Sequence, residues 1–264
     1  MNMHDNLRVL MIGDVVGSAG LDALERLLPD LIREERADFV TVNGENAADG
    51  FGISEETLNR ILNAGADVVT SGNHVWEKRD FLTILDSEKR ILRPANYPDG
   101  NAGHGWIEVE KNGVLWLVIN LQGRELLYLI DCPFRSFDRI LSDLKSTPVI
   151  LVDFHAECTK EKECLAYYID GRASLVVGTH THVPTADERI LPNGTGYISD
   201  LGMTGVSDSI IGMDLKLCLE RVKTQVLYRM DCAEGVTSLQ GVIAEIDRTS
   251  RKTLSISRVN KTNQ

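Results

Sequence analysis

Short apolar runs alternate with helical patterns over the first third of the chain. Each run has the length of a buried strand, and leucines or isoleucines at the spacing of an amphipathic helix follow the first two. The predicted strands cover residues 8–14, 39–46 and 67–74, and the helices between them include residues 21–32 and 58–62. Ser18 and Ser54 are placed to cap these helices. This order predicts a largely parallel sheet covered by helices.

The rest of the chain is less regular but keeps the same α/β character. Residues 105–110 and 114–121 flank an Asn-Gly turn signal, which is typical of an antiparallel hairpin. Residues 213–222 fit a helix, although their apolar residues also alternate as in a strand. The other expected elements are helices at 81–85, 137–144 and 160–170, strands at 147–155 and 175–177, a hairpin at 190–199 and two strands within 241–259. No repeat, linker or domain boundary is recognisable, so we predict one domain spanning residues 1–264.

The composition narrows the class of protein. A hydrophobic content of 43% and a charged content of 25% are ordinary for a soluble globular protein. The formal net charge of −11 argues against non-specific binding of long nucleic acids, which requires a basic surface. A small phosphate ester remains a candidate ligand, because a bound metal can supply the local positive charge.

Cysteine usage and the start of the chain predict a cytoplasmic location. The five cysteines are scattered and form no C-x-x-C pair, which favours free thiols and argues against a structural zinc site. No apolar run is long enough to cross a bilayer, and the first residues lack the pattern of a signal peptide. We therefore expect no membrane partner, and the sequence leaves open whether the chain forms a homo-oligomer.

Polar side chains that can bind metals follow five of the predicted strands. At the last of these strands two histidines lie at positions i and i+2, which face the same side of an extended segment. Because the carboxyl ends of parallel strands meet at one edge of a sheet, all these side chains should lie close together. Four of the six histidines of the chain are among them. The residues are Asp14, Glu45, Asn46, Asn73, His74, His155, His180 and His182.

This set of carboxylates, amides and imidazoles predicts a dinuclear metal site. Carboxylate and amide oxygens suit Mn, and imidazole suits Fe, Zn and Ni. One carboxylate can bridge two ions about 3.5–4 Å apart, which together polarise a phosphoryl oxygen, acidify a bound water and favour its in-line attack on phosphorus. The chain has no G-x-S-x-G, P-loop or G-x-G-x-x-G motif to support a serine nucleophile or another phosphate-binding loop.

The segments around these residues resemble those of a known family. The strings Gly13-Asp14, Gly72-Asn73-His74 and those at residues 43–46, 155–157 and 178–182 resemble the blocks of the calcineurin-like metallophosphoesterases. Longer strings resemble the YmdB branch of that superfamily, and the resemblance runs over most of the chain, from about residue 8 to residue 247. These longer strings lie at residues 12–17, 43–48, 71–76 and 202–205.

The resemblance implies a fold, an activity and a role for each residue. The implied fold is a four-layer α/β/β/α sandwich. The implied activity is phosphodiester hydrolysis, typically of 2′,3′-cyclic nucleotides, with Fe or Mn in the site and Zn as a further option. His74 would contact the phosphate and protonate the leaving oxygen. One metal would be held by Asp14, Glu45, Asn46 and His182, and the other by Glu45, Asn73, His155 and His180, with Glu45 bridging.

Two positions depart from the wider pattern. Val16 stands where the broader superfamily has a histidine ligand, and in the YmdB branch the asparagine after the bridging acid, here Asn46, replaces that ligand. Pro184 stands where the branch resemblance leads us to expect glutamine. The second change concerns the rim of the pocket and the substrate preference, because it touches no expected ligand.

Four further residues are candidates for supporting roles. Asp153 and Asp200 are placed to orient ligating imidazoles. Trp76 and Tyr97 are candidates for stacking on a base, although core packing explains them more simply. We expect a dinuclear metallophosphodiesterase acting on a small phosphodiester. Two alternatives stay open, namely a phosphomonoesterase or nucleotidase, and a metal-stabilised regulatory protein that binds a nucleotide with little turnover.

Overall fold

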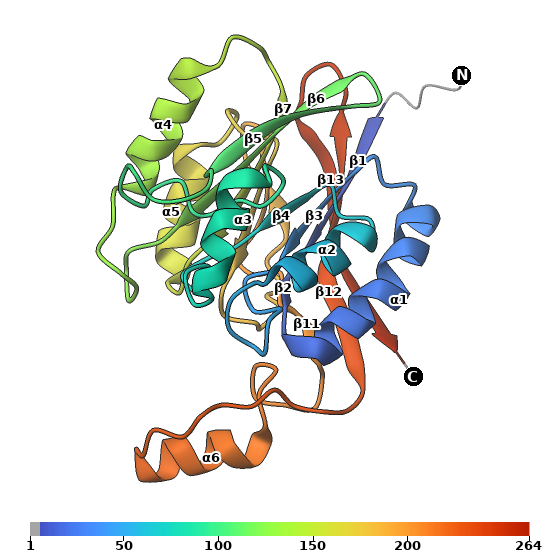
Figure 1. Cartoon of the computed structure of the whole chain (residues 1–264). Helices are drawn as coiled ribbons and strands as arrows, with labels where there is room; N and C mark the ends of the chain where they lie inside the picture. The colour runs from blue at the N-terminus through green and yellow to red at the C-terminus, as the bar shows by residue number, and fades with distance from the viewer. Residues whose placement is uncertain (1–5, 264) are drawn as a thin grey trace.

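Two β-sheets lie face to face, and helices cover the outer face of each (Figure 1). The computed structural model describes residues 6–263. The order of layers is helices, sheet, sheet and helices, which confirms the four-layer α/β/β/α sandwich. Within the described part of the chain, every helix is too short or too polar to cross a membrane.

The first sheet is built from both ends of the chain. Its parallel centre consists of β1 (Asn6–Ile12), β3 (Phe39–Asn43) and β4 (Val68–Thr70), as the strand-helix alternation predicts. The long strand β12 (Thr237–Asp247) runs antiparallel to β1, and β13 (Thr253–Asn263) pairs with β12. The start of β12 also pairs with β11 (Met203–Val206), and β11 in turn pairs with the short strand β2 (Asp14–Val15). The strand order is β2-β11-β12-β1-β3-β4.

The second sheet comes from the middle of the chain. Parallel strands β6 (Val114–Gln122), β7 (Val149–His155), β8 (Leu175–Thr179) and β10 (Gly196–Ile198) form its body. At its edges β5 (Trp106–Lys111) and β9 (Arg189–Ile190) form antiparallel hairpins with β6 and β10, which confirms both predicted hairpins. β7 and β8 are buried along their whole length, as expected for parallel strands covered on both faces.

Three apolar layers hold the sandwich together. α1 (Gly17–Glu35) and α2 (Glu55–Asn63), with the short helices η1 (Arg79–Phe81) and α3 (Leu82–Ser87), cover the first sheet. α4 (Pro133–Asp143) and α5 (Thr159–Tyr168) cover the second. Between the sheets the rings of Phe39 and Trp116 stack with their centroids 4.7 Å apart. Burying an aromatic side chain of this kind is worth about 1.5–3 kcal/mol, so the middle layer fixes the sheets to each other.

Two predictions from the sequence need correction. Ser18 lies inside α1, which begins at Gly17 without a side-chain cap, whereas Ser54 caps α2 by accepting a hydrogen bond from the backbone N–H of Thr57 at 3.2 Å. The five polar strand ends also do not belong to one sheet, since three follow the first sheet and two follow the second. They meet because the two sheets are stacked with these ends on the same side of the molecule.

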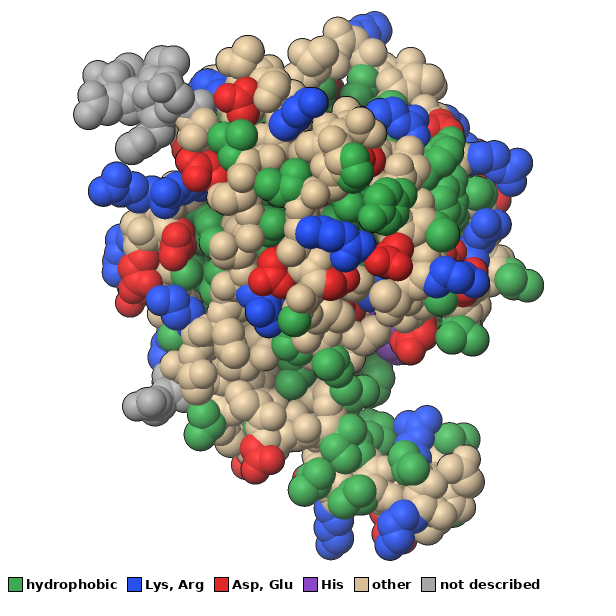
Figure 2. All heavy atoms as spheres, turned by 180° about the vertical axis from the view of Figure 1, so that it is seen from behind, with side chains coloured by type: hydrophobic (Ala, Val, Ile, Leu, Met, Phe, Trp, Pro, Cys, Tyr) green, Lys and Arg blue, Asp and Glu red, His purple; other side chains and the backbone are tan. Residues whose placement is uncertain are grey.

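One segment leaves the sandwich. Residues 207–236, which we call the arm, extend below the body in Figure 1 and carry α6 (Leu215–Thr224), the helix that the sequence favours over a strand. The side chain of Asp214 caps α6 by accepting a backbone hydrogen bond at 2.8 Å. Cys218 is buried, but Leu215 and Leu219 are exposed, and the arm shows an apolar surface when seen from behind in Figure 2. A helix of this length is marginal by itself in water, so the arm depends on the contacts at its base.

Candidate metal centre

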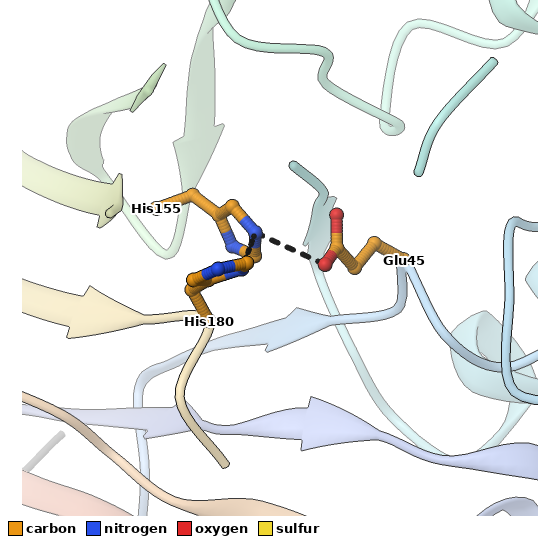
Figure 3. Close-up of side chains that lie close together, drawn as sticks. All are labelled: Glu45, His155 and His180. Atoms are coloured by element: carbon orange, nitrogen blue, oxygen red, sulfur yellow. Dashed lines mark hydrogen bonds and ion pairs between the residues drawn. The ribbon is translucent and has the colours of Figure 1, made fainter. Parts of the chain in front are cut away.

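Glu45 lies at the centre of the predicted site, with nitrogen and oxygen atoms from both sheets around it. Nε2 of His155 lies 3.0 Å from Oε1 of Glu45, 3.1 Å from Oδ1 of Asn73 and 3.0 Å from Nδ1 of His180. Figure 3 shows the Glu45 carboxylate pointing toward the His155 ring, with the His180 ring beside it. The ligand atoms of Glu45, His155 and His180 all lie within 4.8 Å of one another. This convergence is typical of a cation site.

A second group of atoms shares the same carboxylate oxygen. Nδ2 of Asn46 lies 3.2 Å from Oε1 of Glu45, 3.4 Å from Oδ1 of Asp14 and 3.1 Å from Nε2 of His182. Nε2 of His182 lies 3.8 Å from Oδ1 of Asp14. Two carboxylates and an imidazole thus converge on one amide donor. The two groups contain the two predicted ligand sets, and they share Glu45.

The two sheets contribute different chemistry to the site. The oxygen-bearing side chains come directly after β1, β3 or β4 of the first sheet, and the imidazoles of the predicted ligands lie at the end of β7 or after β8 of the second. The first group comprises Asp14, Glu45, Asn46 and Asn73, and the second comprises His155, His180 and His182. The site therefore lies across the junction between the sheets.

Backbone pairing holds Asp14 at the edge of the first sheet. The backbone N–H of Asp14 donates to the carbonyl oxygen of Gly202 at 3.2 Å, and Met203 stands opposite Asp14 in the pairing of β2 with β11. A Cβ atom on Gly13 would lie 2.1 Å from that same carbonyl oxygen, so only glycine fits there. This pairing brings the strings at residues 12–17 and 202–205 side by side in the fold.

The segment 180–182 reaches the site by a different route from the predicted one. β8 ends at Thr179, and φ is 105° at His180 and 63° at His182. Both values lie in the left-handed region, which costs side-chain-bearing residues of order 1–3 kcal/mol each. The expectation of an extended i, i+2 arrangement is therefore wrong. Both rings reach the cluster because the backbone turns sharply after β8, and such strain persists only where surrounding contacts impose it.

Hydrogen-bond partners at Nδ1 orient two of the imidazoles. Nδ1 of His155 lies 3.0 Å from Oγ1 of Thr179, which donates to Asp153 at 2.7 Å. Asp153 therefore acts on the ring through a hydroxyl group. Nδ1 of His182 lies 2.8 Å from the carbonyl oxygen of Ile211. In both rings the partner at Nδ1 leaves Nε2 for the cluster, as in histidine ligands of metal sites.

Burial and mutual attraction perturb the ionisation of the cluster. Burial raises the pKa of Asp14 to about 6. Burial also opposes the charged forms of Glu45 and His155, but their attraction outweighs it, so that the pKa of Glu45 falls to about 2 and that of His155 rises to about 9. Burial, followed by the charge of His155, lowers the pKa of His180 to about 3. A buried carboxylate and a neutral imidazole would both be stabilised by a bound cation.

The donor set fits a pair of transition-metal ions. Carboxylate, amide and imidazole donors are those that Mn, Fe and Zn accept in proteins. The backbone beside these donors makes room for them because residue 72 is glycine. A Cβ atom on Gly72 would lie only 2.4 Å from Oε2 of Glu45 and 2.3 Å from Nε2 of His155. The number and identity of the ions, and the assignment of each side chain as a ligand, remain predictions from the sequence.

The cluster opens into a cleft of about 420 Å³, a size suited to a small organic ligand. His74 lines this cleft, and its backbone N–H donates to Oε2 of Glu45 at 3.2 Å. Nδ1 of His74 lies 3.3 Å from Oε1 of Glu77. On another wall Oε2 of Glu157 lies 3.2 Å from Nε2 of His180. The structure thus brings all eight predicted site residues to one place.

The sequence analysis did not predict several of the residues that line the cleft. Phe51 lies in the loop after β3, and its position beyond the Glu45-Asn46 pair could have indicated it. The arm supplies Ile211, Met213, Arg221 and Met230, which follow no strand end and carried no such signal.

Three other candidates lie outside the cleft lining. Trp76 and Tyr97 pack edge to face with their ring centroids 5.2 Å apart, which agrees with core packing. Pro184 is exposed, and its Cβ lies 2.9 Å from where a Cβ atom on Gly202 would be. Pro184 therefore lies beside Gly202, the residue before β11, and any effect of this position on the cleft would be indirect.

Comparison with known proteins decides the family. A family model described as "YmdB-like protein" matches residues 10–259. The chain belongs to the YmdB-like family. This YmdB-like chain is 47% identical to a Bacillus subtilis (strain 168) protein named 2′,3′-cyclic-nucleotide 2′-phosphodiesterase, with 96% of each chain covered. It is 31% identical to a Mycoplasma pneumoniae protein named putative phosphatase/phosphodiesterase, over 96% of this chain and 92% of the relative.

Solved structures support the same membership. A structure described as a novel phosphatase from Mycoplasma pneumoniae superposes with a TM-score of 0.92 at 30% identity, covering 98% of this chain and 95% of that one. A hypothetical protein from Thermus thermophilus gives a TM-score of 0.91 at 40% identity, covering 98% of this chain and 100% of that one. The NAD nucleotidase of Haemophilus influenzae shares the YmdB-like fold, with a TM-score of 0.61 at 13% identity over 97% of this chain and 55% of that one.

Proposed function

We propose that the chain is a dinuclear-metal-dependent phosphodiesterase that hydrolyses small phosphodiesters, with 2′,3′-cyclic nucleotides as the substrate class. The observation that carries this proposal is the sharing of Oε1 of Glu45 by two clusters of ligand-type atoms. The name of the 47%-identical Bacillus subtilis relative supports the choice of substrate class.

The two clusters would each hold one ion. We assign Asp14, Glu45, Asn46 and His182 to the first and Glu45, Asn73, His155 and His180 to the second. The Asn46 amide would turn its oxygen toward the ion, since its Nδ2 now faces the other three side chains. Mn or Fe is the proposed metal, with Zn as a further option. Two bound ions would polarise the phosphoryl oxygens and acidify a water molecule.

His74 is the proposed general acid. It lines the cleft beside the cluster, and its side chain is 27% exposed, so a substrate in the cleft can reach the ring. The carboxylate of Glu77 faces Nδ1 and can accept a hydrogen bond from it. The backbone hydrogen bond to Glu45 ties His74 to the centre of the site. We propose that Nε2 donates a proton to the leaving oxygen when the ester bond breaks.

The cleft walls suit the other parts of a nucleotide. Phe51, Ile211, Met213 and Met230 give it an apolar side on which a base can pack. Arg221 places a guanidinium on the same cleft, where it can pair with a phosphate oxygen. We propose the cytoplasm as the location, because all five cysteines are free thiols, which persist in a reducing compartment.

Removal and return of metal tests this function. The purified protein is stripped with a chelator, dialysed and assayed for hydrolysis of 2′,3′-cyclic AMP, then assayed again with added Mn²⁺, Fe²⁺ or Zn²⁺. We expect activity to disappear on stripping and to return with at least one ion. A folded His155→Ala variant, checked by circular dichroism, should stay inactive with every ion.

Three outcomes would contradict the proposal. Hydrolysis at the original rate after complete stripping would exclude a metal-dependent reaction. A metal-loaded protein that cleaves p-nitrophenyl phosphate but not bis-p-nitrophenyl phosphate or the cyclic nucleotide would instead be a phosphomonoesterase. Tight nucleotide binding without product over hours would indicate a binding protein.

A further inference from the structure

A buried ion pair outside the predicted ligand set contacts the strained histidine loop. Nζ of Lys162, on α5, lies 2.8 Å from Oδ2 of Asp200, which follows β10. Both side chains are only 2% exposed. Enclosing two opposite charges in this way is expensive, and apolar side chains of similar volume often give equal or greater stability. The pair therefore calls for a specific explanation.

The Asp200 carboxylate connects two segments that carry site residues. Its Oδ2 accepts the backbone N–H of Thr181 at 3.2 Å, and its Oδ1 accepts the backbone N–H of Gly202 at 2.9 Å. Thr181 stands between His180 and His182, the two histidines with positive φ. Gly202 leads into β11, which pairs with the strand that begins at Asp14. Asp200 thus binds the backbone between two imidazoles rather than an imidazole itself.

The neighbouring chain makes room for the lysine. A Cβ atom on Gly178 would lie 2.8 Å from Cδ of Lys162 and 1.8 Å from the carbonyl oxygen of Ser199. The glycine that opens the Gly-Thr-His-Thr-His string is therefore needed where the lysine side chain passes the end of β8. The string and the ion pair belong to one structural unit.

We propose that Lys162 is a positioning residue of the metal centre. Its ammonium group holds the Asp200 carboxylate against the N–H of Thr181, and this hydrogen bond sets the backbone from which His180 and His182 project. His180 belongs to one proposed ligand set and His182 to the other, so a single ion pair positions one imidazole in each half of the centre. This inference rests on the proposed function, since it assumes that the two halves bind metal.

A Lys162→Met variant tests the inference, because methionine fills similar space without charge. Binding of Mn²⁺ to stripped protein is measured by titration calorimetry, and the bound metal is counted per chain. We expect the affinity to fall roughly 10–100-fold, the usual effect of removing a group that supports metal ligands. The midpoint of activation by Mn²⁺ should shift upward by a similar factor, while kcat at saturating Mn²⁺ changes much less. A merely structural role would lower the amount of folded protein without moving this midpoint.

Lys111→Met is the matched control. Lys111 pairs with Asp67 at 2.7 Å and is partly buried on the β5–β6 hairpin, at the opposite ends of the strands from the site. This variant should bind Mn²⁺ as the wild type does. If the wild type binds no Mn²⁺, Fe²⁺ or Zn²⁺ at all, the proposed function fails; if it binds and Lys162→Met binds equally well, only the positioning role fails.

The double variant Lys162→Met/Asp200→Asn covers the case in which the single variant does not fold. It removes both buried charges together, and the asparagine oxygen can still accept one of the two backbone hydrogen bonds. We expect it to unfold at a higher temperature than Lys162→Met and to bind Mn²⁺ more weakly than the wild type. Wild-type affinity and stoichiometry in the folded double variant would overturn the inference.

Discussion

Glu45 is fully buried, and the atoms around it explain why it stays ionised. The attraction of His155 lowers the pKa of Glu45 despite burial, while Asp14, whose burial is less well compensated, has a raised pKa. One carboxylate is thus ready to ligate at neutral pH, and the other gains from a nearby cation. At the scale of single residues, this difference distinguishes Glu45, the proposed bridging acid, from Asp14, the proposed ligand of one ion only.

Replacing His74 by asparagine tests the proposed acid. We expect kcat for 2′,3′-cyclic AMP to fall about 10²–10⁴-fold, since proton donation to the leaving oxygen is lost. The loss should be much smaller for bis-p-nitrophenyl phosphate, because nitrophenolate leaves without protonation. Steady-state kinetics on both substrates, with metal content measured in parallel, provide the comparison.

His104→Asn is a suitable control for that experiment, because His104 is exposed and lies outside the cleft lining. Its kinetics should match those of the wild type. An equal loss on both substrates in the His74 variant would argue against proton donation and for a role in binding.

A Gly72→Ala variant tests how closely the metal-binding side chains must approach the backbone at residue 72. The Cβ atom of a Gly72→Ala variant would collide with Glu45 and His155, neither of which can move without leaving the cluster. We expect the variant to lose metal and at least 100-fold in activity, a loss comparable to that caused by misplacing reacting groups by about 1 Å.

Gly205→Ala is the matched glycine change on β11. There the added Cβ would meet its nearest neighbour at 3.4 Å, an ordinary contact. Metal content measured by atomic absorption should be normal in this variant. Normal metal content in Gly72→Ala would show that the cluster can rearrange, contrary to our expectation.

Single residues were the easiest part to predict from the sequence. Each of the eight site residues follows an apolar run, and the runs are readable because buried strands need continuous hydrophobic sequence. Backbone turns carry no such signal, which is why the positive φ values of His180 and His182 were missed. The hydrogen bond between Asp200 and Thr181 joins the loops after β10 and β8, so it could not be predicted from local pattern.

At the scale of elements, the loop after β8 depends on anchors in the segment that it faces. Asp187 accepts the backbone N–H of Ser199 at 3.1 Å and also the hydroxyl group of the same residue. Burial opposes its charge, but the hydrogen bonds from Ser199 and Thr185 outweigh burial and lower the pKa of Asp187 below its ordinary value of 3.8. The ionised carboxylate therefore stabilises the folded state.

An Asp187→Asn variant should show this anchor as a pH-dependent stability difference. At pH 7 we expect the free energy of unfolding to fall by about 1–2 kcal/mol, the usual cost of weakening hydrogen bonds to a charged group. The pKa of Asp187 is lower in the folded state than in the unfolded state. Its carboxylate therefore stabilises the fold fully above the pKa of the unfolded state, and this stabilisation is lost as pH falls through the pKa of the folded state. The gap between variant and wild type should therefore narrow below pH 4.

Urea unfolding at pH 7 and at pH 3 measures that gap. The exposed Asp99, changed to asparagine, serves as the control and should leave stability nearly unchanged at both values. A constant difference at both pH values would mean that the charge of Asp187 contributes nothing and that the change acts through packing.

Element types were predicted better than their partners. The two hairpins, the helix of residues 215–224 and the strands β7 and β8 were all recognisable, because turn residues and apolar period are local properties. The division into two sheets was not derivable in this way, and only the family resemblance implied it. Pairing of β12 with β1 joins residues more than 200 positions apart, which no local pattern encodes.

At the scale of the whole molecule, the arm projects away from the sandwich and yet forms one wall of the cleft. Arg221 on α6 is the positively charged residue that the arm contributes to the cleft lining. We expect Arg221→Gln to raise KM roughly tenfold with little change in kcat, as for an interaction present equally in bound substrate and transition state.

Lys223→Gln, two residues further along α6, controls for the general charge of the arm. Its side chain is 71% exposed, and it does not line the cleft. Steady-state kinetics of both variants should separate the two positions. Equal effects would point to long-range attraction of the substrate, which added salt would then weaken in both.

The origin of the donors in two sheets has a consequence for folding. Oxygen ligands from one sheet and imidazoles from the other would make each bound ion a link between halves of the sandwich. An ion held only by the complete pair of sheets adds about 2.7 kcal/mol at a free concentration one hundred times its Kd. Neither sheet could then open alone without releasing it. Metal loading would therefore merge two partly independent layers into one cooperative unit, and hydrogen exchange in β3 and β7 should slow together when the ions bind.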